Sequence, residues 1–148
     1  MKVYKYLTQK LVFFLDAESK EETLNQIVKM TVDGIHLPEG ERFLKAIFDR
    51  EKIVSTGIGM GVAIPHAKLS AYNDFFIAIA CLKSGIDWNA LDGAPVRLIF
   101  LIGGPDDKQT EYLKILSSLT DVLRDEELRK NLIGATSAKE VINLFEIL

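Results

Sequence analysis

The segment from Arg50 to His66 gathers residue types that handle phosphate. His66 follows Pro65, and a neutral imidazole is a competent nucleophile at cellular pH because its ordinary pKa is about 6.5. Arg50 lies sixteen positions earlier and carries a forked cation that matches the geometry of phosphate oxygens. The proline restricts the backbone around it, so we expect His66 at a well-defined strand end. This pattern predicts a site that accepts or binds a phosphoryl group.

Five residues between the arginine and the histidine add groups that can bind an anion. Ser55 and Thr56 carry hydroxyl donors, and Gly57, Gly59 and Gly61 alternate with other residues. Alternating glycines let the backbone bend sharply and present bare amides to an anion. We therefore expect all five residues to bind phosphate oxygens.

The glycines also fit two other interpretations. A dinucleotide-binding fingerprint needs G-x-G-x-x-G between a strand and a helix. Gly59 and Gly61 are instead followed by Ile64, with a helix expected before them and a strand after them, so this interpretation is rejected. The other interpretation stays open from the residues alone: the glycines make a tight connection, and His66 is a buried histidine with satisfied ring nitrogens.

Two helices are expected before this segment. Ser19 and Glu22 form a capping box that begins the first helix, and Gly34 is its natural stop. The second helix follows Pro38 and closes over residues 49–51. Apolar stripes give their inner faces, with Leu24, Ile27, Val28, Thr31 and Val32 in the first helix and Phe43, Leu44, Ile47 and Phe48 in the second.

Strands and then further helices are expected in the rest of the chain. The strands are residues 11–15, 62–64, 75–82 and 96–102, of which the last two are nearly continuous apolar runs typical of strands covered on both faces. Helical stripes follow at Tyr112, Leu116, Leu119 and Leu123, over residues 126–133, and after Ser137 with Val141, Leu144, Phe145 and Leu148 inward. The connection over residues 65–74 is short for a crossover. We therefore predict an α/β fold with a mixed β-sheet flanked by helices.

The composition sets the broad class of protein. The 148 residues are expected to form a single domain, and 48% apolar with 26% charged residues is typical of globular proteins. A formal charge of −3 gives no basic footprint for nucleic acid, and no apolar run reaches membrane-spanning length. Cys81 is the only cysteine, which excludes a disulfide within the chain. We expect a cytoplasmic protein with no metal or cofactor, no nucleic-acid partner and no direct membrane insertion.

The same segment resembles the active-site signature of a known protein family. Glu51, Ile58-Gly59 and the run from Val62 to Ala67 match the IIA type-2 component of the bacterial phosphoenolpyruvate-dependent phosphotransferase system, the fructose–mannitol–nitrogen-regulatory type. The resemblance covers nearly the whole chain, since further matches lie at residues 19–22, 55–59, 86–96 and 136–140. It implies the family's α/β fold.

The resemblance also implies an activity. His66 would receive a phosphoryl group from the phosphohistidine of the small carrier HPr and pass it to a cysteine or histidine of a IIB component. Arg50 and the segment from Ser55 to Gly61 would then stabilise the equatorial phosphate oxygens, and positioning would supply most of the catalysis. No divalent metal is implied.

Tyr112 departs from the family pattern. The family places a second histidine in the first turn of the helix after the central strand, beside the phosphoryl acceptor, and here Tyr112 occupies that place. A phenol can donate one hydrogen bond to phosphate, but with an ordinary pKa near 10 it cannot become cationic. Alternatively, Tyr112 is an ordinary core aromatic residue. His36 is expected to be a loop residue. Lys68 is expected to be a lone solvated lysine, with contact to a negatively charged partner as the alternative.

Three functions are compatible with these residues. The first is phosphoryl transfer to a sugar permease of a fructose-like system. The second is a nitrogen-regulatory IIA protein whose phosphorylation state controls binding to a protein target. The third is a degenerate binding module that no longer transfers phosphate, which the change at Tyr112 keeps open.

Overall fold

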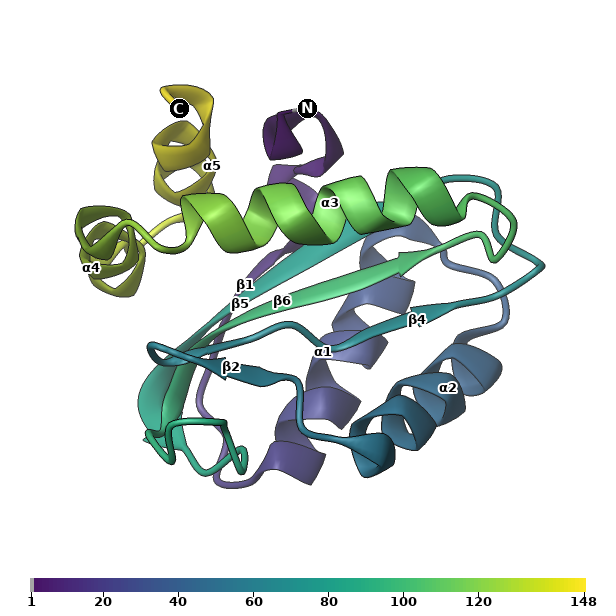
Figure 1. Ribbon diagram of the computed structural model, residues 1–148, viewed down its shortest axis with the longest axis horizontal. Helices are drawn as coiled ribbons and strands as arrows, with labels where there is room; N and C mark the ends of the chain where they lie inside the picture. Colours follow the sequence, from purple (N-terminus) through teal and green to yellow (C-terminus); the bar gives the residue numbers. More distant parts are fainter. Residues whose placement is uncertain (1) are drawn as a thin grey trace.

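Across residues 2–148, which the computed structural model describes, six strands form one mixed sheet with helices on both faces (Figure 1). The sheet order is β1-β5-β6-β3-β2, and β4 also pairs with β6. The strands are β1 (Val12–Leu15), β2 (Gly57–Gly59), β3 (Val62–Ala63), β4 (His66–Lys68), β5 (Phe76–Ile86) and β6 (Val96–Gly104). The helices are α1 (Lys20–Ile35), α2 (Gly40–Ile53), α3 (Gln109–Val122), α4 (Glu126–Gly134) and α5 (Ala138–Glu146), and two short 3-10 helices, η1 (Val3–Tyr6) and η2 (Gln9–Leu11), precede β1. The predicted fold class is confirmed.

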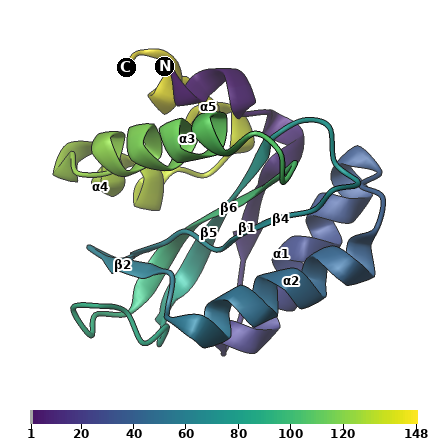
Figure 2. The ribbon, with the colours of Figure 1, turned by 45° about the vertical axis from the view of Figure 1, so that its right-hand side comes forward.

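The two faces of the sheet pack against different helices. Figure 2 shows α1 and α2 on one side of the strands and α3, α4 and α5 on the other. Successive residues of a strand point to opposite faces, and β5 follows this rule. Its residues Ala78 and Ala80 belong to the core with α1 and α2, whereas Ile77 and Ile79 belong to the core with the C-terminal helices. The near-continuous apolar strands are therefore covered on both faces, as predicted.

Strands β3 and β4 lie one after the other along β6. Both run parallel to β6, with Ala63 opposite Ile99 and His66 opposite Ile102. The central pair β5 and β6 is antiparallel, which confirms the mixed sheet expected from the short connection before β5. Along this edge, the pairing of β3 with β6 ends at Ala63 and that of β4 begins at His66, so the break lies directly before the histidine.

Two predicted helix ends differ from the structure. The Ser19 hydroxyl caps α1 by accepting the Glu22 amide at 3.1 Å, as predicted, but Gly34 does not stop the helix. The left-handed cap is His36, with a φ of 52°. Gly34 serves close packing instead, because a Cβ there would lie 3.0 Å from the carbonyl oxygen of Lys10. In the same way, α2 does not close over residues 49–51 and continues to Ile53.

The C-terminal helices follow the predicted stripes, with one exception. Val141 and Phe145 of α5 are buried, and Leu119 and Leu123 are buried at and after the end of α3. Leu148 was expected to point inward but is 44% exposed, because α5 ends before it.

Strands β2 and β4 were not predicted. The stretch with the alternating glycines, where the backbone was expected to bend sharply, forms a hairpin in which β2 pairs antiparallel with β3. Met60 and Gly61 have positive φ angles of 61° and 76°, as both central residues of a type I′ hairpin turn require. Three-residue strands give too short an alternation to be recognised in a sequence.

Two aromatic rings cover a bare end of β6. A Cβ on Gly103 would overlap the ring of Phe76, and a Cβ on Gly104 would overlap the ring of Phe75. The absence of side chains at these two positions therefore lets both rings pack against the strand next to β4.

Candidate functional site

His66 lies where pairing with β6 resumes after a break. Ile102 of β6 donates its amide to the carbonyl oxygen of Pro65 at 2.9 Å, and Ile64 donates its amide to Thr56 at 3.0 Å. Pro65 itself has no amide hydrogen to donate. The backbone on both sides of the histidine is thus fixed by hydrogen bonds, and the His66 side chain is half-buried.

A backbone carbonyl fixes the proton of the His66 ring. Nδ1 of His66 lies 2.8 Å from the carbonyl oxygen of Ile64. A carbonyl oxygen only accepts hydrogen bonds, so Nδ1 carries the hydrogen and donates it. In the neutral ring the lone pair is then on Nε2. Nε2 is therefore the ring nitrogen whose lone pair is available.

Burial lowers the pKa of His66 below the ordinary value for histidine. The hydrogen bond to Ile64 and the Glu51 carboxylate act in the opposite direction, and the charges of Arg50 and Lys68 lower the pKa further. The net effect keeps the imidazole neutral at cellular pH, which is the form that can attack phosphorus.

Arg50 is half-buried in the last turn of α2. One of its guanidinium nitrogens donates to the carbonyl oxygen of Val54 at 2.8 Å. Its charge also lowers the pKa values of His66 and of Tyr112, although burial dominates both and raises that of the tyrosine. The structure thus brings Arg50, His66 and Tyr112 into one neighbourhood.

Glu51 ties the end of α2 to the start of β2. Its buried carboxylate accepts the backbone amide of Thr56 at 3.1 Å and also the Thr56 hydroxyl. Lys20 of α1 forms an ion pair with it at 2.7 Å, and the indole of Trp88 donates to the Thr56 hydroxyl at 3.3 Å. The Thr56 hydroxyl therefore already has partners inside the protein.

Ser55 and the glycines also have partners in the hairpin. The Ser55 hydroxyl donates to the carbonyl oxygen of Trp88 at 2.6 Å and accepts the Gly57 amide at 3.1 Å. Gly59 and Gly61 adopt positive φ angles of 96° and 76°, which shape the turn. Phosphate binding by these residues stays a prediction, and their observed contacts give them a supporting role in holding the hairpin.

Tyr112 lies beside His66, and it is also a core residue. Its ring centroid is 5.7 Å from that of His66, and the ring stacks on Phe75 at 6.0 Å with an interplanar angle of 17°. Tyr112 is 5% exposed. Burial raises the pKa of its phenol to about 12, so the hydroxyl keeps its hydrogen at cellular pH. Tyr112 is thus a core aromatic residue that also lies beside His66, and phosphate binding by its hydroxyl stays a prediction.

Sequence reasoning missed the neighbours of this tyrosine. Lys68 is half-buried and was wrongly expected to be a solvated lysine. Its ammonium lies 4.5 Å from the Tyr112 ring centroid and donates to Gln109 at 2.5 Å. The spacing of two from His66 would have placed both side chains on one face, had β4 been predicted.

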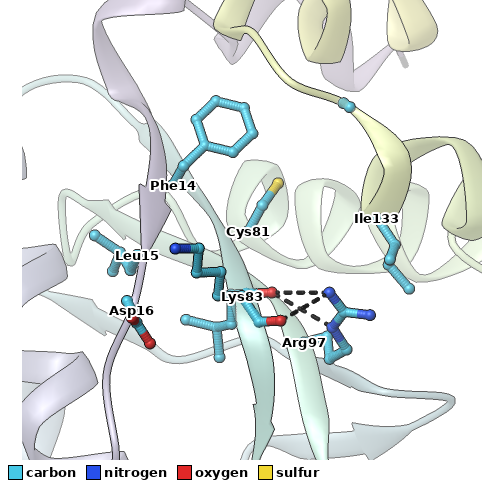
Figure 3. A pocket seen from close by; sticks show the side chains of 9 residues that line it. Phe14, Leu15, Asp16, Cys81, Lys83, Arg97 and Ile133 are labelled. Carbon is cyan, nitrogen blue, oxygen red and sulfur yellow. Dashed lines mark hydrogen bonds between the residues drawn. The ribbon is translucent and has the colours of Figure 1, made fainter.

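A separate cavity lies away from His66, Arg50 and Tyr112. Its volume is about 270 Å³. Figure 3 shows the side chains that line it, among them Arg97, which donates to the backbone oxygens of Leu82 and Lys83. Cys81 also lines it, and burial raises the pKa of its thiol to about 11. The lining includes none of the site residues expected from the sequence.

Within residues 2–148 no group of three or more His, Cys, Asp or Glu side chains could hold a metal ion.

Comparison with known proteins shows the family. Residues 5–147 match the family model of the phosphoenolpyruvate-dependent sugar phosphotransferase system, EIIA 2. The fructose-specific EIIABC component of Bacillus subtilis is 34% identical over 145 residues, which are 97% of this chain and 23% of that protein. The nitrogen regulatory protein homolog of Haemophilus influenzae is 36% identical over 87% of this chain and 80% of that protein.

Solved structures agree with this similarity. The nitrogen regulatory protein IIA-Ntr of Neisseria meningitidis has a TM-score of 0.89 and 27% identity, covering 97% of this chain and 98% of that one. The IIA mannitol enzyme of Escherichia coli, in its complex with phosphorylated IIB mannitol, has a TM-score of 0.80 and 25% identity, covering 96% of this chain and 98% of that one. No helix in the described part of the chain is long and apolar enough to cross a membrane. The chain belongs to the EIIA 2 family of the phosphoenolpyruvate-dependent sugar phosphotransferase system.

Proposed function

We propose that this chain is a phosphohistidine carrier that accepts a phosphoryl group from phospho-HPr on Nε2 of His66 and passes it to a IIB component. The hydrogen bond from Nδ1 to the Ile64 carbonyl carries the proposal, because it leaves Nε2 as the only ring nitrogen with a lone pair. The proposed donor works in the cytoplasm, so the proposal places the chain there as well.

The bonds that form and break in the transfer from phospho-HPr involve only the phosphoryl group and the two histidines. The lone pair on Nε2 of His66 attacks the phosphorus of phospho-HPr while the N–P bond of the donor breaks, and the donor imidazole keeps the electron pair of that bond. His66 then carries positive charge over its ring, and the Nδ1 hydrogen bond to Ile64 stabilises it. Transfer onward reverses these roles, with a cysteine thiolate or a histidine of the IIB component as nucleophile.

Arg50 and Tyr112 supply charge and a donor for the phosphoryl oxygens. The Arg50 guanidinium bonds Val54 through one nitrogen, and its forked shape can bind phosphate oxygens through the others. The Tyr112 hydroxyl keeps its hydrogen because burial raises its pKa to about 12. Both groups are fixed before the reaction, which is where electrostatic catalysis gains most.

The acceptor of the phosphoryl group defines two versions of the proposal. A fructose-like transport role is supported by the similarity to the fructose-specific component of Bacillus subtilis. A nitrogen-regulatory role, in which the phosphorylation state controls binding to a protein target, is supported by the TM-score of 0.89 to IIA-Ntr. Both versions share phosphorylation at His66.

Reconstituted transfer tests the shared step. The chain is incubated with phosphoenolpyruvate, enzyme I and HPr, and intact-mass analysis should show one acid-labile phosphoryl group. His66→Ala should abolish the labelling. His36→Asn is the matched control, since asparagine tolerates the left-handed conformation found at position 36, and it should be labelled normally. Labelling of His66→Ala at the wild-type level would disprove the proposal.

A chase separates the two versions. Addition of a fructose-type IIB component to the phosphorylated chain should remove the phosphoryl group if the role is transport. A phosphorylated chain that keeps its label beside IIB components would favour the regulatory version.

A further inference from the structure

Lys68 makes contacts that connect it with the proposed phosphoryl acceptor. Its Nζ lies 4.5 Å from the centroid of the Tyr112 ring and donates a hydrogen bond of 2.5 Å to Oε1 of Gln109. The imidazole of His66 is a second neighbour of the same ring, with centroids 5.7 Å apart. One buried phenol ring therefore has both an ammonium and the proposed acceptor beside it.

Strand β4 gives Lys68 and His66 the same direction. Residues two apart in a strand point to the same face, and the residue between them, Ala67, packs in the core with α1 and α2. His66 and Lys68 thus project toward the opposite face, which α3 covers. Both side chains are half-buried, and the Lys68 charge contributes to lowering the pKa of His66. The lysine therefore acts electrostatically on the imidazole before any phosphate is present.

A phosphoryl group on His66 concentrates negative charge in this half-buried position. Arg50 can neutralise part of that charge, but Tyr112 cannot contribute a cation because its phenol stays neutral. An ammonium is a compact point charge that suits phosphate oxygens, and the face of an aromatic ring attracts it. Held against the ring of Tyr112, the lysine loses little further freedom when it binds phosphate.

We propose that Lys68 binds the phosphoryl group on His66 as its second cation, and that Tyr112 is the aromatic platform that holds the ammonium beside the imidazole. Gln109 holds the same ammonium in the unphosphorylated protein. This inference rests on the proposed function, because it needs His66 to be the phosphoryl acceptor.

Two phosphoryl donors separate binding of phosphate from docking of a protein. Phospho-HPr must dock, whereas phosphoramidate is a small donor that needs no protein surface. Lys68→Met removes the charge but keeps an unbranched side chain, and Lys68→Arg keeps the charge. Lys114→Met, which removes an exposed lysine from α3, is the matched control. Labelling rates at His66 are measured with both donors for the wild type and all three variants.

We expect Lys68→Met to slow labelling about 10- to 100-fold with both donors, because the substitution removes one preorganised charged donor. Lys68→Arg should retain most of the rate, and Lys114→Met should match the wild type. Nuclear magnetic resonance titration of the unphosphorylated protein gives a second readout, in which the pKa of His66 should rise in Lys68→Met. A lysine that served only the packing of Tyr112 would leave the labelling rate of the folded protein unchanged.

The outcomes that overturn the inference differ from those that overturn the function. Equal labelling of Lys68→Met and wild type by phosphoramidate would overturn the role of Lys68. This holds even if the variant is labelled more slowly by phospho-HPr, because that slowing would then come from docking of the donor protein. If phosphoramidate labels wild-type His66 and phospho-HPr does not, the carrier function fails, and the phosphoramidate rates still decide the role of Lys68. Absence of labelling by both donors would overturn both.

Discussion

Glu51 accepts two hydrogen bonds from Thr56, one from its backbone amide and one from its hydroxyl. The same carboxylate forms an ion pair with Lys20 at 2.7 Å and is 5% exposed. These contacts join the last turn of α2, which carries Arg50, to the first residues of the hairpin that leads to His66. Glu51 therefore sets the position of the arginine relative to the histidine.

Removal of this carboxylate should destabilise the fold. Glu51→Ala leaves the Thr56 amide and the Lys20 ammonium without their partner, which should lower the free energy of unfolding by about 2–4 kcal/mol in urea denaturation. Asp49→Ala is a control on the exposed side of the same helix, where it breaks only a surface ion pair with Lys45. The control should leave the midpoint nearly unchanged. Similar midpoints for both variants would show that the Glu51 network is not stabilising.

Replacement of Arg50 should slow transfer without unfolding the protein. Arg50→Ala removes a preorganised charged donor, so we expect phosphorylation by phospho-HPr to slow by roughly 10²–10³-fold. The melting temperature should change little, because the side chain is half-buried and bonds only one carbonyl at a helix end. A large drop in melting temperature with a normal rate would mean that Arg50 is structural.

The two roles of Tyr112 predict different effects of substitution. If its hydroxyl donates to phosphate, Tyr112→Phe should cost about 0.5–1.5 kcal/mol of transition-state stabilisation, a few-fold in rate. Tyr112→His should then maintain or raise the rate, because imidazole becomes a charged donor when phosphate favours its protonation. A silent Tyr112→Phe together with a destabilised Tyr112→His would exclude the role of the hydroxyl and leave the ring with its packing and its contact with Lys68. Rates and thermal unfolding of both variants are the measurements.

The lowered pKa of His66 predicts the pH dependence of the acceptor. Lowering means that folding favours the unprotonated ring, so the nucleophilic form persists as the pH falls past the ordinary value of about 6.5. The reactive fraction should be constant above this value and be lost only at lower pH. Titration of the His66 ring resonances from roughly pH 5 to 8 measures it. A midpoint above the ordinary value would contradict the prediction.

Long apolar runs and side-chain caps were sufficient to predict most of the fold. The runs that became β5 and β6, and the caps at Ser19 and Ser137, are local signals that packing did not override. Gly34 was misread because a glycine inside a helix can serve close packing as well as termination. The sequence alone does not show where two segments approach so closely that only glycine fits between them.

The neighbourhood of His66 could be anticipated where its residues are close in sequence. His66 and Arg50 were proposed from one segment of the chain, and Tyr112 from the resemblance to the family; their roles stay predictions. The contacts of Lys68 with Tyr112 and Gln109 exist because β4 lies next to α3 in the fold. Lys68 and Gln109 are forty-one residues apart in the sequence. The internal partners of Ser55 and Thr56 depend in the same way on Trp88, which lies in a distant loop.

The end of β6 that lacks side chains makes substitutions at positions 75, 104 and 112 depend on one another. Phe75 packs where Gly104 has no side chain, and the same ring stacks on Tyr112. A larger residue at Gly104 would push Phe75 against Tyr112 and so disturb the proposed phosphoryl site through two rings. Variation at Gly104 is therefore tolerable only with a smaller residue at position 75, and libraries that retune this site should change the two positions as a pair.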